Sequence, residues 1–256
     1  MQHITIRHLI DTNRARLEAG TLQAQSQSEA LCLYQDQDND CRCGVGATLN
    51  ADSLKTVHDL NHNNDPYYEL VGRDIISFST TWVPKITQLL HDRWASKLPI
   101  VATDPIHAFL EPLLNTIPNE DTYRAWLDFL EPWACFEELR DFVASNEYDF
   151  DFDFDFDFDF GLAFAAPKCG TAGCIAGHAA VLWPEVREHT PEPDPHVISW
   201  DCIALKQKLN LTDEQHRALF LQPHDHERCP LAYTDITRER AIAAMDRYLE
   251  TGEIWF

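Results

Sequence analysis

The sequence predicts a mainly α protein with a few short strands, built as two helical lobes. Three observations support this fold class. Apolar residues recur at helical spacing in several segments, capping residues flank those segments, and a single long segment has the strand period of two. With seven Trp, fourteen Phe and a hydrophobic content of 45%, the 256 residues also carry enough apolar surface for folded cores.

The first lobe is expected to comprise residues 1–99. A helix is predicted over residues 6–19, because its apolar residues share one face and Gly20 follows at the position where helices commonly end. A short helix is expected around residues 53–60. Another is expected over residues 82–98, where Trp and aliphatic residues are three or four positions apart.

The second lobe is expected to comprise residues 100–256, after a boundary within Pro99–Asp104. A helix that starts at Asn119 is predicted to end at Pro132, because a proline inside a helix lacks the N–H that the helix requires. Four further helical patterns follow: residues 135–144, residues 171–183, residues 199–209 and a pattern that begins with the capping box Thr212-Asp213-Glu214-Gln215. The last predicted helix covers residues 237–251 and is closed by Gly252.

The net charge of −22 restricts the classes of partner. Direct binding to nucleic acid or to an anionic membrane is disfavoured, because both require a cationic surface, and a basic protein partner is favoured. The first residues lack the layout of a signal peptide, and no apolar run reaches the roughly 18–20 residues that span a bilayer. A cytoplasmic location is therefore expected, with the eight Cys residues reduced.

The most unusual segment is the strict alternation of Asp and aromatic residues at 148–160. Thirteen residues here carry six acids and no base, more than a quarter of the net charge. An extended chain would present one aromatic face and one carboxylate face, with carboxylates every ~6.6 Å. Repulsion between neighbouring carboxylates amounts to about 3 kcal/mol in total, whereas burial of each Phe returns about 1.5–3 kcal/mol. An ordered strand is therefore possible if the aromatic face is covered.

Several interpretations of this segment remain open. The carboxylates could mimic the phosphates of a nucleic acid and bind a basic groove, or the segment could pair with another chain as a sheet edge. A calcium loop of the EF-hand type is disfavoured, because Phe160 and Ala166 stand where Gly and Glu are required. A tolerated dipeptide repeat is the alternative without function. The mimicry hypothesis assigns partner binding to Asp149, Asp151, Asp153, Asp155, Asp157 and Asp159.

A second motif is Cys169-Gly170-Thr171-Ala172-Gly173-Cys174-Ile175-Ala176-Gly177-His178. Cys169, Cys174 and His178 could bind zinc, since Cys and His are its usual ligands, but their spacing is not a strong zinc signature. The favoured interpretation is close helix packing through the small residues, so no metal or other cofactor is expected. Cys43-Gly44-Val45-Gly46 has the same Cys-x-x-Gly spacing.

From about residue 125 onward, the chain resembles a group of uncharacterised phage and prokaryotic proteins. The resemblance rests on three motifs: the Cys-Gly-Thr-x-x-Cys-x-x-Gly pattern at 169–177, Asn-Leu-Thr-Asp-Glu-Gln at 210–215 followed by Leu-Phe, and Thr-Gly-Glu-Ile-Trp at 251–255. It covers about half of the chain, and the Asp/aromatic run departs from the pattern of that group. The resemblance implies a phage-like context, in which small acidic proteins often inhibit host defence, but it implies no activity.

No nucleophile motif, phosphate-binding glycine loop or His-Glu-x-x-His motif is present, so the chain is not expected to be an enzyme. The leading hypothesis is an acidic protein-binding inhibitor of phage or mobile-element origin, which mimics nucleic acid and acts on a basic nucleic-acid-binding protein. The alternative is a metal-stabilised helical interaction module of unknown partner.

Overall fold

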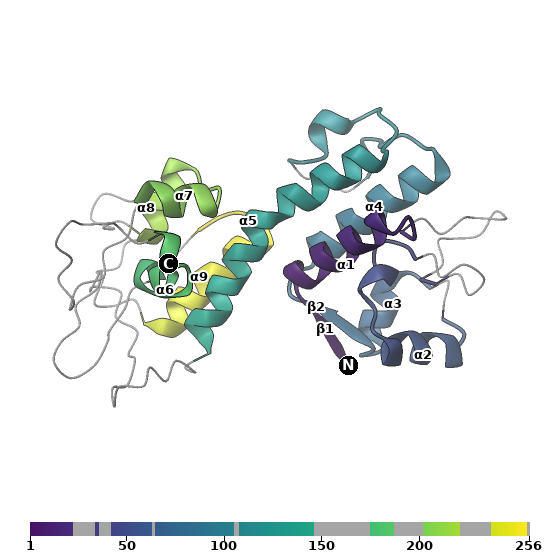
Figure 1. Cartoon of the computed structure of the whole chain (residues 1–256), viewed down its shortest axis with the longest axis horizontal. Coiled ribbons are helices and arrows are strands. Elements are labelled where there is room, and N and C mark those ends of the chain that lie inside the picture. Colours follow the sequence, from purple (N-terminus) through teal and green to yellow (C-terminus); the bar gives the residue numbers. More distant parts are fainter. Residues whose placement is uncertain are drawn as a thin grey trace. The chain divides into compact units, whose positions relative to one another are not determined.

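The structure is a computed structural model that describes residues 1–22, 34–35, 42–62, 65–104, 108–145, 175–186, 202–220 and 237–254. These residues form nine α-helices, three short 3₁₀ helices and one sheet of two short parallel strands (Figure 1). The predicted mainly α fold class is confirmed. The strand expected at 148–160 lies outside the described residues. No helix in the described part of the chain has the length and apolar character needed to cross a membrane.

The contacts divide the chain into two compact units, Met1–Ala134 and Cys135–Phe256. This division differs from the expected lobes, 1–99 and 100–256. The reason is that the expected boundary segment is held within the first unit. The backbone N–H of Ile100 donates to Thr116, and the carbonyl of Ile100 accepts from Asn115. Arg93 also forms an ion pair with Asp104 at 2.7 Å.

In the first unit, β1 (Gln2–Ile4) pairs in parallel with β2 (Ile76–Phe78), with Gln2 opposite Ile76. Each strand leads almost directly into a long helix, α1 (Ile6–Glu18) after β1 and α4 (Trp82–Ser96) after β2. Shorter helices lie between them in sequence: α2 (Ala51–Asp59), α3 (Tyr67–Gly72) and the 3₁₀ turn η1 (Gly46–Thr48). The 3₁₀ turn η2 (Glu111–Leu113) then precedes α5 (Glu120–Ala144).

The ends of α1 follow from its flanking residues. Thr5 is extended and its hydroxyl accepts the N–H of His8, so it caps the first turn. Gly20 has φ of +66° just past the last turn, a left-handed conformation that glycine adopts without steric strain. Both ends agree with the helix predicted over residues 6–19.

Helix α5 is continuous, and the expected end at Pro132 is wrong. Pro132 lies inside the helix, where a proline costs roughly 3 kcal/mol because it removes one backbone hydrogen bond and crowds the preceding turn. The large side chains of Trp126 and Phe136 are fully buried on either side of it, and so is Leu130. Each buried side chain of this size contributes about 1.5–3 kcal/mol, so packing along both halves outweighs the local defect.

The second unit contains residues 135–144 of α5 together with α6 (Ile175–Leu182), the 3₁₀ turn η3 (Pro184–Val186), α7 (Cys202–Lys208), α8 (Asp213–Phe220) and α9 (Arg238–Thr251). The ring of Phe136 lies 4.3 Å from that of Tyr248, which joins α5 to α9. The capping box is confirmed, because Thr212 and Gln215 exchange hydrogen bonds at the start of α8. Gly252 closes α9 with φ of +74°.

Candidate functional site

The residues that sequence reasoning assigned to partner binding are all in 146–174, which lies outside the described residues. The six aspartates of the run are among them, and so are Cys169 and Cys174 of the possible zinc set. His178 is the member of these sets that the structure places. The carboxylate ladder therefore stays a prediction.

His178 lies inside α6 and is only 2% exposed. Its ring is 5.8 Å from the ring of Phe142 on α5, in an edge-to-face arrangement. Every residue of α6 from Ile175 to Val181 is buried, as expected for a helix that is apolar on all sides. Ala176 and Gly177 are part of this buried surface, which agrees with the packing interpretation of the motif. Among the placed residues, no group of three His, Cys, Asp or Glu side chains could hold a metal ion.

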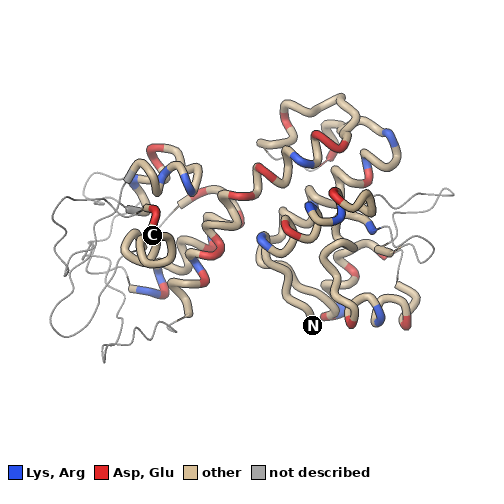
Figure 2. Tube along the Cα trace, in the orientation of Figure 1, with Lys and Arg blue, Asp and Glu red and all other residues tan. Residues whose placement is uncertain are grey.

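The net charge is distributed unevenly along the chain. Figure 2 marks the Lys, Arg, Asp and Glu residues of the described ranges. The 84 residues outside the described ranges carry 18 of the 42 acids but only 3 of the 20 Lys and Arg residues. They hold −15 of the net −22, whereas the 172 described residues hold −7. The excess of acids over Lys and Arg is therefore concentrated in a third of the sequence.

In the first unit, acidic side chains of α5 are paired with arginines of α1. Glu131 accepts from Arg7 at 2.5 Å and from Arg14, and Arg14 also reaches Asp128 at 2.6 Å. Burial by itself would raise the pKa of Glu131, but the hydrogen bonds from the two arginines outweigh it and hold the pKa below its ordinary value. These carboxylates hold α1 against α5 and are already neutralised.

Other acids of α5 have partners on the same helix. Glu120 pairs with Arg124 one turn later at 2.6 Å, and Asp141 pairs with its neighbour Arg140 at 3.1 Å. Exposed pairs of this kind contribute little to stability, about 0–1 kcal/mol, but they reduce the local field. Four of the seven acids of α5 are therefore paired with arginines, which neutralises much of the negative charge of this helix.

A buried polar network surrounds the loop that contains Cys43-Gly44-Val45-Gly46. The side-chain amide of Asn13 donates to the carbonyl of Gly44 at 3.1 Å and to the carbonyl of Leu9 at 2.8 Å. The hydroxyl of Tyr123 donates to the amide oxygen of Asn13 at 2.9 Å. A Cβ on Gly44 would stand 2.6 Å from this hydroxyl, so only glycine fits there. The glycine of the Cys-x-x-Gly spacing is Gly46, where an added Cβ would lie 2.1 Å from the backbone carbonyl oxygen of Tyr34.

Cys43 and His91 are the reactive residue types of this core. The N–H of Gly46 donates to the Cys43 sulfur at 3.2 Å, and Nε2 of His91 lies 3.1 Å from the carbonyl of Leu22. Burial would lower the pKa of His91, but Asp92, Cys43 and the carbonyl of Leu22 together raise it. Both side chains are fully buried, so no substrate reaches them in this structure. Their arrangement serves the packing of α4 against the loop.

No family model, curated protein or solved structure matches this chain. Its charge distribution and its internal contacts are therefore the basis for a functional proposal. The network of Asn13 was missed by sequence reasoning, although one signal was present. Asn13 stands four residues after Leu9 and four before Leu17, on the apolar face of α1, where a polar side chain needs a buried partner.

Proposed function

We propose that this chain is an acidic protein-binding inhibitor that mimics nucleic acid and occupies the basic surface of a nucleic-acid-binding partner. The observation that carries the proposal is the charge distribution: −15 of −22 belongs to 84 residues that contain only three basic side chains. The proposed contact residues are the six aspartates of the 148–160 run, Asp149 to Asp159. The chain would act without a cofactor and without binding nucleic acid itself.

The contrast with α5 supports this assignment. The acids at Glu131, Asp128 and Glu120 are neutralised by arginines within the first unit, so they serve the fold. The 148–160 run offers six acids and no base in thirteen residues, so no base within the run itself neutralises them. Such a block of like charge raises the rate of encounter with a basic partner and rejects acidic proteins.

The spacing of the run supports mimicry in particular. Carboxylates on one face of an extended chain recur every ~6.6 Å. Phosphates on one DNA strand rise about 3.4 Å per nucleotide along the axis, and the helical turn increases their separation to a similar value. The aromatic residues on the other face would anchor the strand by burial, about 1.5–3 kcal/mol each. The resemblance of residues 125–256 to phage and prokaryotic proteins adds a context in which inhibition of a host defence enzyme fits.

The test replaces the six aspartates of the run with asparagine and compares capture of nucleic-acid-binding proteins from a host lysate at low and high salt. A matched control has the same charge change on exposed acids elsewhere: Asp11, Glu18, Glu69, Glu111, Asp121 and Glu239, each changed to its amide. We expect the run variant to lose most of the salt-sensitive capture and the control to keep it. A double-stranded DNA competitor should displace the captured proteins from the wild type.

Equal capture by the run variant and the wild type would contradict the assignment of the run. Equal loss in both variants would show that total charge, rather than the run, determines binding. Circular dichroism of each variant checks that the helical content is kept.

A further inference from the structure

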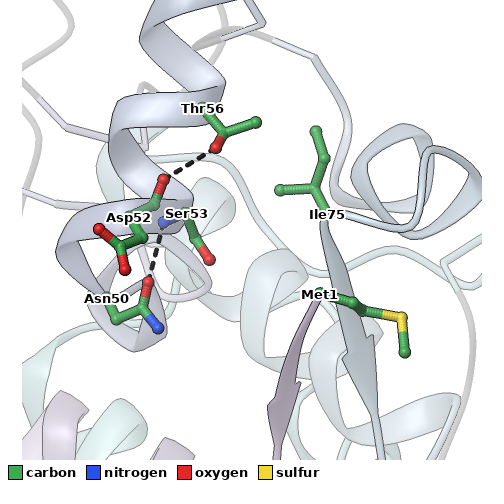
Figure 3. A pocket seen from close by; sticks show the side chains of 6 residues that line it. All are labelled: Met1, Asn50, Asp52, Ser53, Thr56 and Ile75. Atoms are coloured by element: carbon green, nitrogen blue, oxygen red, sulfur yellow. Dashed lines mark hydrogen bonds between the residues drawn. The ribbon is translucent and has the colours of Figure 1, made fainter.

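We draw no further inference here: the strongest candidate, a hollow of about 270 Å³ at the surface of the first unit that is lined by Met1, Asn50, Asp52, Ser53, Thr56 and Ile75 (Figure 3), lies at the N-terminal turn of α2, and no second feature of the described residues points to a ligand there.

Discussion

Replacing Asn13 with leucine should strongly destabilise the first unit, because it removes a fully buried polar side chain while keeping the same branched arrangement of side-chain heavy atoms. The substitution leaves the hydroxyl of Tyr123 without the acceptor at 2.9 Å and the carbonyl of Gly44 without the donor at 3.1 Å. A buried polar group that loses its partner costs about 1–3 kcal/mol. Two such groups give about 2–6 kcal/mol, a large share of the 5–15 kcal/mol that typically stabilises a domain.

The assay is equilibrium unfolding in urea, followed by tryptophan fluorescence. Four of the seven Trp residues, Trp82, Trp94, Trp126 and Trp133, belong to the first unit, so unfolding of this unit contributes most of the fluorescence change. A decrease of about 3–4 kcal/mol in the free energy of unfolding is expected. Thr12→Val is the matched control, because the Thr12 hydroxyl bonds only to carbonyls of its own helix, and its loss should change stability by less than about 1 kcal/mol.

A double-mutant cycle with Tyr123→Phe identifies the cause. Phenylalanine removes the hydroxyl that Asn13→Leu leaves unsatisfied, so the double variant should be more stable than the sum of the two single effects by about 1–3 kcal/mol. Additive effects of the two substitutions would refute the reasoning. So would an Asn13→Leu variant whose free energy of unfolding differs from that of the wild type by less than about 0.5 kcal/mol, the usual effect of a surface substitution.

Two further predictions concern the same unit. Because the folded pKa of Glu131 is lowered, its pairs with Arg7 and Arg14 contribute stability above the unfolded pKa of about 4.3, and this contribution disappears as the pH falls through the folded pKa. Glu131→Gln should therefore destabilise the unit at pH 7, and its free energy of unfolding should fall less steeply as the pH is lowered. If the free energy of unfolding changes with pH equally in both proteins between about pH 5 and 3, the explanation is contradicted. Gly20 and Gly72 both have open space around an added Cβ, but only Gly20 has positive φ. Melting temperatures should show Gly20→Ala destabilising by about 1 kcal/mol and Gly72→Ala neutral or stabilising, and the opposite order would be inconsistent with the backbone explanation.

The fold was predictable where local chemistry decides it. Thr237 and Gly252 mark the ends of α9, and the capping box at Thr212 marks the start of α8, because caps act within a few residues. The continuity of α5 through Pro132 was not predictable, since the packing that offsets the proline comes from side chains distant in sequence. The strands of three residues were missed for a related reason: β1 and β2 are too short to show a period.

The candidate sites also divide into those that the sequence predicts and those that it does not. The charge of the 148–160 run and its period are properties of the sequence, so the hypothesis of a carboxylate ladder needs no structure. The Asn13–Tyr123 pair joins residues 110 positions apart, and the hollow at Ser53 joins α2 to the start of β2 and to Met1. Neither could be predicted, because single-sequence patterns contain no information on which distant segments meet.

The parallel pairing of β1 with β2 also has a consequence for biosynthesis. The partner of Gln2 is Ile76, 74 residues later, and synthesis at about 5–20 residues per second delays the pairing by roughly 4–15 s. Tyr123 and Trp126, which complete the first core, are made later still. The acidic run at 148–160 follows them, so it leaves the ribosome when all the segments of the first unit have already been made. The six aspartates of the run are thus synthesised only after every segment of the first unit.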